Sequence, residues 1–320
     1  MQCRDQGLKI NLDLEYTKDS RNTSENRVEN GPQIPDVSII IPNLNSMIID
    51  RTLASLFTQT SFARVLEILV IGLDNPQLVK ERFPVRFIST VTPVTAPVAR
   101  NIGICEASGD YYAFIDADCV ADPHWLEMLL LAQCRGHSIV GGSVALDTGN
   151  YWQQCYNLTM FHEFLTSKAP GERRNFGTLN LCVSRDVVER TGLFDESLAR
   201  GQDTEWTLRM RRCGYQLYFT PDAIIQHYPD QPSVRKIWSV WYRSGNFNAR
   251  IRNEYKDLIP APPFHKFPLL LVIFAPWIAF VVAALIFMRD PCLLRYIHTF
   301  PVIYLSKIAW CLGASRHDGF

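Results

Sequence analysis

The sequence predicts an α/β fold in which a mainly parallel sheet is flanked by helices, followed by a hydrophobic helical segment towards the C-terminal end. Three observations support this prediction. Short β-rich runs alternate with stretches of helical apolar spacing, as in a sheet with helical crossovers. The β-rich runs are almost continuously apolar, as strands buried on both faces are. Residues 267–288 form an uncharged run of about 22 residues, long enough to cross a bilayer core.

The alternation begins with "VSIIIP" (37–42), which predicts a buried strand closed by a proline. The elements expected next are a helix at 50–58, a strand at 65–73, a strand at 85–90, a helix at 95–108, a strand at 110–118, a helix from 122 and a strand at 138–146. The region after residue 150 is aromatic and less regular. Ligands of open α/β sheets lie beyond the carboxyl ends of the strands, so the loops after these strands should share one rim.

Composition excludes several classes of protein. The 320 residues contain 32 basic and 32 acidic side chains, and the pI is near 7.0. A balanced charge gives no electrostatic case for nucleic acid as a partner. The nine cysteines contain no Cys-x-x-Cys pair, which indicates reduced thiols and argues against structural zinc.

Three segments are expected: a flexible polar leader at 1–35, an α/β domain at 36–255 and membrane-associated helices at 256–320. Basic residues precede the apolar run, so the positive-inside rule places the α/β domain in the cytoplasm. The protein is therefore expected to be membrane-associated with this large domain in the cytoplasm. The alternative is that the apolar run forms a buried helical hairpin.

Two carboxylates separated by one alanine end the fourth predicted strand, in "DYYAFIDAD". On a strand with a period of two, Asp116 and Asp118 would project to one side, roughly 7 Å apart at their Cα atoms. That arrangement suits a shared cation. The alternative is a solvated strand end.

Four segments in order, "VSIIIPNLN", "SLFTQT", "APVARNIGICEASGDYYAFIDADCV" and the stretch from "GTLNLC" to "DAIIQH", resemble the motifs of a family 2 glycosyltransferase. The resemblance covers roughly residues 36–250. It implies a GT-A fold, a Rossmann-like sheet, and transfer of a sugar from a nucleotide-diphosphate sugar to an acceptor hydroxyl.

The resemblance implies a metal site. Asp118 corresponds to a direct ligand of Mg²⁺ or Mn²⁺, Asp116 to a residue that engages the donor ribose and the same metal, and His227 in "AIIQHYP" to a late histidine near the metal. Such a cation neutralises the charge that develops on a nucleoside diphosphate leaving group. The alternative for His227 is a structural role at a strand end.

The donor-binding residues that the resemblance implies are Pro42, Asn43, Asn45, Asp74, Arg100, Asn101 and Asp116. Arg100 would face the phosphates and Asn101 the nucleoside; the alternatives are a surface ion pair and an ordinary polar contact. The family usually has an acidic pair after its second strand, where this chain has Gly72 and Leu73. Asp74 can substitute only if the loop shifts, so the nucleobase cannot be read from the sequence.

Asp203 in "RGQDTEW" corresponds to the family's catalytic base, which takes the proton of the acceptor hydroxyl. Gln202 replaces the acidic residue that usually precedes it, and Glu205 either compensates or caps the following helix. The acceptor side is expected to include Asn180, Gln202 and Trp206. The alternative for Trp206 is a core position.

The resulting hypothesis is a metal-dependent, inverting glycosyltransferase of polysaccharide or glycolipid synthesis. It would use a nucleotide-diphosphate sugar, a lipid-linked or saccharide acceptor, and a membrane surface. The stretch after the base lacks the Gln-x-x-Arg-Trp signature of processive synthases, which indicates one sugar per event. The alternatives are a nucleotidyltransferase of similar architecture and a catalytically silent, membrane-anchored nucleotide-sugar-binding protein.

Overall fold

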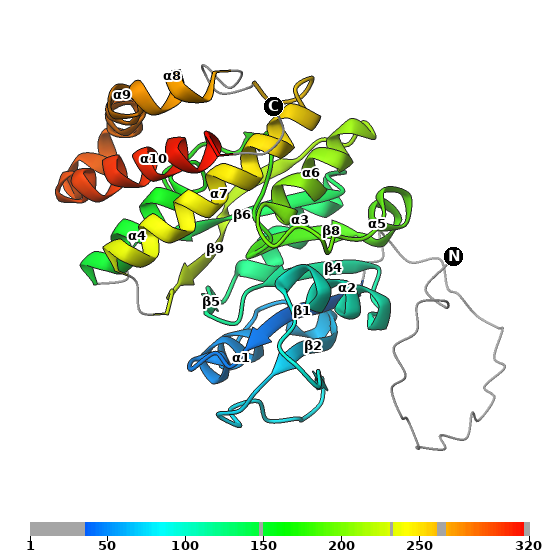
Figure 1. Ribbon diagram of the computed structural model, residues 1–320. Coiled ribbons are helices and arrows are strands. Elements are labelled where there is room, and N and C mark those ends of the chain that lie inside the picture. The colour runs from blue at the N-terminus through cyan, green and yellow to red at the C-terminus, as the bar shows by residue number, and fades with distance from the viewer. Residues whose placement is uncertain (1–35, 147–149, 231–232, 261–266, 317–320) are drawn as a thin grey trace, which may run out of the picture. The chain divides into compact units, whose positions relative to one another are not determined.

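A nine-stranded sheet runs through the computed structural model, which describes residues 36–146, 150–230, 233–260 and 267–316 (Figure 1). The predicted leader at 1–35 lies outside the described residues. The strands are β1 (Val37–Leu44), β2 (Val65–Leu73), β3 (Val85–Ser89), β4 (Tyr111–Ile115), β5 (Cys119–Ala121), β6 (Ile139–Ala145), β7 (Gly171–Glu172), β8 (Asn180–Ser184) and β9 (Tyr218–His227). Their order is β3-β2-β1-β4-β8-β6-β9-β5, and β7 pairs with β9.

The sheet is mixed rather than mainly parallel. Strand β1 pairs in parallel with β2 and β4, and β2 pairs in parallel with β3, as the alternating sequence predicted. Strand β8, however, enters antiparallel between β4 and β6, and β5 pairs antiparallel with the end of β9. The alternation of strands and helices does not predict these pairings, because antiparallel neighbours need no crossover helix between them.

Helices cover both faces of the sheet. The helices are α1 (Ile49–Phe57), α2 (Ala96–Glu106), α3 (Trp125–Cys134), α4 (Tyr151–Phe161), α5 (Arg185–Thr191), α6 (Gln202–Arg212), α7 (Val234–Glu254), α8 (Pro268–Ile273), α9 (Ala275–Met288) and α10 (Phe300–Ala314), with 3₁₀ turns η1 (Phe62–Arg64) and η2 (Pro291–Thr299). Within β1, Ile39 and Ile41 pack in one core with α1 and α3, whereas Ile40 packs in a second core with α2 and α6. This period of two explains why β1 is apolar throughout.

The apolar run 267–288 does not form one helix. It is divided into α8 and α9 at Phe274, whose φ and ψ are −88° and 0°. Pro276 lies in the first turn of α9 and has no N–H to donate to a preceding turn. Across the described ranges, no helix combines the length and apolar character that a membrane crossing requires. The predicted membrane segment, and the membrane-associated localisation with a cytoplasmic catalytic domain, are therefore overturned.

The C-terminal helices pack on the α/β domain instead. Ala283, Ile286 and Phe287 of α9 form a buried cluster with Leu158 of α4. Helices α7 and α10 lie side by side (Figure 1), since a Cβ atom on Gly313 would fall 1.8 Å from the carbonyl oxygen of Tyr242. The alternative of a buried helical hairpin holds only for one face of this segment, because Leu269, Trp277 and Met288 remain exposed.

Candidate active site

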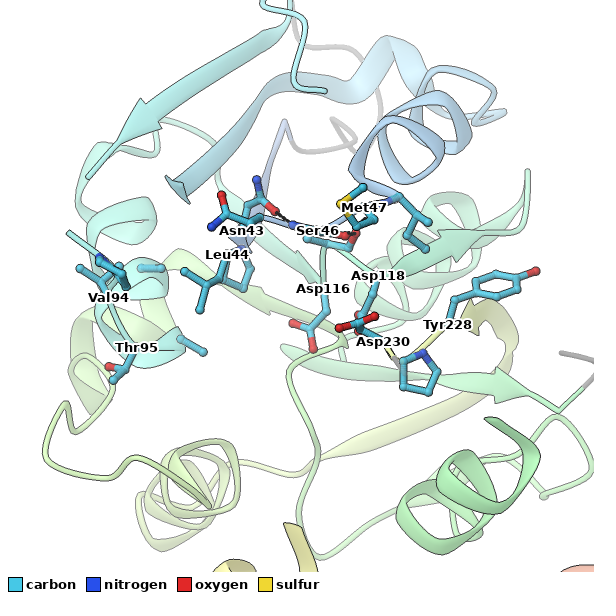
Figure 2. A pocket seen from close by; sticks show the side chains of 18 of the residues that line it. Asn43, Leu44, Ser46, Met47, Val94, Thr95, Asp116, Asp118, Tyr228 and Asp230 are labelled. Carbon is cyan, nitrogen blue, oxygen red and sulfur yellow. Dashed lines mark hydrogen bonds between the residues drawn. The ribbon is translucent and has the colours of Figure 1, made fainter. Parts of the chain in front are cut away.

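A cavity of about 950 Å³ opens beyond the ends of β1 and β4. Figure 2 shows the carboxylates of Asp116 and Asp118 pointing into it between Leu44 and Tyr228. Its lining comes from the β1 loop, the start of α2, the Asp116–Asp118 turn, α4 and the segment after β9. The segments that follow β1, β3 and β4 thus share this rim, whereas the loop after β2 contributes no lining residue among those described. The cavity volume is in the range of small-molecule sites.

Asp116 and Asp118 do not sit on a strand. Strand β4 ends at Ile115, and the Cys119 N–H donates to the Asp116 carbonyl oxygen across 3.0 Å, which closes a turn. The carbonyl oxygen of Ala117 accepts hydrogen bonds from Ser46 Oγ at 2.7 Å and Thr52 Oγ1 at 3.0 Å. Two hydroxyls from the β1–α1 region thus fix this turn. The strand that the alternation predicted at Asp116 and Asp118 is therefore wrong, and Asp116 is paired with Arg100 rather than grouped with Asp118 around a common metal position.

The buried, positively charged guanidinium of Arg100 lies beside this turn. Its Nη2 donates to Asp116 Oδ1 across 2.7 Å, and the residue is only 3% exposed. Its Nε and Nη1 are buried without a hydrogen-bond partner in the described residues. A buried guanidinium with two unused donors is poised for an anionic group, because unmet donors in a protein interior are costly.

Asp118 lies next to His227, with Nε2 and Oδ2 3.4 Å apart. Burial raises the pKa of Asp118, but the charge and hydrogen bond of His227 outweigh burial and the net shift is downward. A ligand atom of Cys119 joins these two within 4.8 Å, since β5 pairs Cys119 directly opposite His227. Burial holds the pKa of the Cys119 thiol well above its usual range, so this sulfur stays protonated.

A carboxylate oxygen and an imidazole nitrogen at this spacing fit Mn²⁺ or Mg²⁺, with the open cavity leaving coordination positions for phosphate oxygens and water. The two residues come from segments that are far apart in the sequence and meet only through the β5–β9 pairing. The geometry thus supports Asp118 and His227 as the cation-binding pair.

Asp203 stands at the start of α6, after Gly201 at φ 76°. Its Oδ1 accepts from the Thr204 N–H at 2.8 Å. Burial raises its pKa above the usual value, while the positive charge of Arg100 lowers it and the negative charge of Asp116 raises it. The carboxylate therefore shares one electrostatic environment with the Arg100–Asp116 pair. A raised pKa suits a group that must accept a proton near neutral pH.

Three predicted site residues are buried and hydrogen-bonded to other residues of the protein. The Asn101 Nδ2 donates to Phe194 O and Glu196 Oε1, and its Oδ1 accepts from the Phe194 N–H. Asn180 accepts from Trp125 Nε1 and donates twice to main-chain oxygens. Trp206 is fully buried and donates its Nε1–H to Gly192 O. Their placement supports structural roles, which was the alternative for Trp206.

Two asparagines at the end of β1 hold the loop that follows it through hydrogen bonds of their side chains. Pro42, Asn43 and Asn45 line the cavity. Asn43 donates to Leu73 O at 2.9 Å and accepts from the Ser46 N–H at 3.0 Å, while Asn45 accepts from the Asn75 N–H at 2.7 Å. Their amides therefore hold the loop against β2.

Asp74 and Gln202 are not among the described residues that line the cavity. Asp74 Oδ2 caps its own loop by accepting from the Val79 N–H at 2.7 Å. Glu205, expected either to compensate for Gln202 or to cap the helix, has other partners: it accepts from Arg209 at 3.0 and 2.8 Å and from the Tyr255 hydroxyl at 2.8 Å. Glu205 thus joins α6 to the end of α7.

Several residues that line the cavity were not predicted from the sequence. Helix α4 supplies Asn150 and Gln153 to the cavity lining, and Tyr228 and Asp230 line it from the segment after β9. The sequence did hold a signal for the start of α4, because asparagine is a preferred N-cap residue. In the structure Asn150 is this N-cap and accepts from the N–H groups of Trp152 and Gln153. Its position at the cavity comes only from tertiary packing.

Comparisons with known proteins give the family and the fold. The model of the family "Glycosyl transferase family 2" matches residues 38–190. The chain is 31% identical over 209 residues to Glycosyltransferase AglE of Haloferax volcanii, which covers 62% of this chain and 68% of that protein. It is 25% identical over 266 residues to Probable glycosyltransferase YdaM of Bacillus subtilis, covering 77% and 62%. The structure of GalNAc-T7 with UDP, GalNAc and Mn²⁺ aligns with a TM-score of 0.53 at 16% identity, covering 78% of this chain and 51% of that one, which shows a common fold.

Proposed function

The chain belongs to glycosyltransferase family 2, and from this premise we propose that it moves a single sugar from a nucleotide-diphosphate sugar to a hydroxyl of a saccharide or lipid-linked acceptor, with inversion at the anomeric carbon. The observation that carries the proposal is the meeting of Arg100, Asp116 and Asp118 at one cavity, with the buried carboxylate of Asp203 close enough to feel the charges of Arg100 and Asp116. Family membership removes the nucleotidyltransferase alternative.

The donor diphosphate would lie between two sources of positive charge. Arg100, which lines the cavity, has two nitrogens without a partner among the described residues, Nε and Nη1, and Asp118 with His227 would hold Mn²⁺ or Mg²⁺. When bound, the cation neutralises charge on the departing nucleoside diphosphate. The relative crystallised with UDP and Mn²⁺ supports this assignment at the level of fold.

Asp203 would accept the acceptor's proton. As the hydroxyl oxygen bonds to the anomeric carbon, the bond from that carbon to the phosphate oxygen breaks, and the hydroxyl proton passes to the Asp203 carboxylate. A single displacement with one base inverts the configuration. With Glu205 bound to Arg209 and Tyr255, no second carboxylate of α6 is free to act as a nucleophile.

A screen of nucleotide sugars tests the proposal. Purified full-length protein is incubated with each donor, with Mn²⁺, with Mg²⁺ or with EDTA, and products are separated. Release of a nucleoside diphosphate from one or a few donors, only with metal, is the expected result. Pyrophosphate as the product, or full release in EDTA, would contradict it.

The matched variants are Asp203→Asn and Asp118→Ala. Asp203→Asn should bind the active donor normally by calorimetry but fail to transfer, whereas Asp118→Ala should lose metal-dependent donor binding. Unchanged transfer by Asp203→Asn would refute the base assignment.

A further inference from the structure

The buried side-chain amide of Asn157 contacts the imidazole ring of His227. Asn157 of α4 is fully buried, and its Oδ1 lies 2.6 Å from His227 Nδ1. Its Nδ2 donates to the His227 carbonyl oxygen across 2.9 Å. We propose that Asn157 is a positioning residue that fixes the tautomer and orientation of His227, so that Nε2 faces the cation at Asp118. This inference rests on the proposed function.

The direction of the Asn157 amide is determined by its neighbours. A carbonyl oxygen can only accept a hydrogen bond, so the atom facing the His227 carbonyl must be the Nδ2 donor. The other end of the amide, facing His227 Nδ1, is therefore an oxygen, which also only accepts. His227 Nδ1 must then carry the hydrogen.

A hydrogen on Nδ1 leaves the lone pair of a neutral imidazole on Nε2. Nε2 is the nitrogen that points at Asp118, 3.4 Å from Oδ2. The opposite tautomer would present an N–H to the cation and could not ligate it. Partners of this kind behind metal-ligating histidines set ring orientation and ligand basicity.

Aromatic contacts restrict rotation of the same ring. Phe161 meets His227 edge-on, with ring centroids 5.4 Å apart and an interplanar angle of 88°, and the Tyr156 ring lies 5.9 Å away. Both belong to α4, and Phe161 stands one helical turn after Asn157. One turn before Asn157, Gln153 lines the cavity. One face of helix α4 thus contacts His227 and lines the cavity.

The test is binding of Mn²⁺, measured by the loss of the free-ion EPR signal with full-length protein and a fixed concentration of UDP. The variants are Asn157→Leu, which removes the acceptor at similar volume, and Asn157→Asp, which keeps an acceptor for the Nδ1–H but cannot donate to the His227 carbonyl. We expect Asn157→Leu to weaken Mn²⁺ binding by about 10- to 100-fold and Asn157→Asp to bind as tightly as the parent or more tightly. A merely structural amide would make both variants equally weak.

The tautomer itself is measured in the parent protein by long-range ¹⁵N–¹H NMR of labelled histidine. A hydrogen on His227 Nδ1 is expected; a ring that carries its hydrogen on Nε2 alone would overturn the inference even if no Asn157 variant folds.

His227→Ala distinguishes loss of the Asn157 role from loss of the metal site itself. If His227→Ala weakens Mn²⁺ binding and Asn157→Leu does not, only the role of Asn157 fails. If His227→Ala and Asp118→Ala both bind Mn²⁺ like the parent, the proposed metal site itself fails, and the inference with it.

Discussion

A Cβ atom on Gly72 would lie 2.0 Å from the main-chain oxygen of Asn43. The two residues are register partners in the parallel β1–β2 pair, and Gly72 has a φ of 133°. Glycine alone combines that backbone angle with so close an approach. Gly72, which stands where the family usually has an acidic pair, therefore lets β2 approach the main chain of β1 closely.

Gly72→Ala is expected to lower the free energy of unfolding by about 2–4 kcal/mol, from the strained φ and the clash with backbone. Chemical denaturation measures this loss. Gly136→Ala is the matched control: its φ is 94° but nothing lies within 4 Å of the added carbon, so it should lose about 1 kcal/mol. Equal losses would show that the contact with Asn43 has no effect.

Asp203→Asn is expected to raise the thermal unfolding midpoint at pH 7 while it abolishes transfer. The pKa of Asp203 is raised in the folded protein, mainly by burial. The folded state then binds its proton more tightly than the unfolded state, so stability falls as pH rises from the unfolded to the folded pKa. Above that window the ionised carboxylate destabilises the fold, and a neutral amide removes the penalty. Calorimetry at pH 4 and pH 7 should show the gain shrinking at the lower pH; a constant gain would contradict it.

Arg100→Gln is expected to reduce transfer by about 100-fold and to move the acid limb of the pH–rate profile upward. Arg100 lowers the pKa of Asp203, so its removal lets that pKa rise, and the base is ionised only at higher pH. Rates at saturating donor across pH 4–9 measure both effects. Arg86→Gln is the control, since Arg86 pairs with Glu106 at 3.1 Å on the exposed surface. An unmoved acid limb in Arg100→Gln would contradict the coupling.

Glu205→Gln is expected to impair folding rather than catalysis. It breaks a nearly buried ion pair with Arg209, which typically costs about 3 kcal/mol. Transfer by the folded variant should stay within about threefold of the parent. Tyr255→Phe removes one hydrogen bond to the same carboxylate and should cost about 1 kcal/mol. A selective loss of kcat in Glu205→Gln would instead make Glu205 part of the catalytic machinery.

Local pattern predicted the strands well where both faces are covered. In β1 and β2 every second residue enters a different core, so the apolar runs alone identified them. It failed at Asp116–Asp118, where a turn closed by the Cys119 N–H replaces the strand. The failure is physical: the turn is held by Ser46 and Thr52, which lie far away in the sequence.

The sequence by itself determined the order of the motifs, and with it the family, because residue type and spacing carry that information. The grouping of Arg100, Asp116, Asp118 and Asp203 in one site was predicted from the same motifs. Only the tertiary structure decided how each polar side chain is used. Asn101 is bound to Phe194, 93 residues away, and Asn157 is bound to His227, 70 residues away. A side chain's role depends on whether its donors and acceptors are already satisfied, and those partners come from distant segments that only folding brings together.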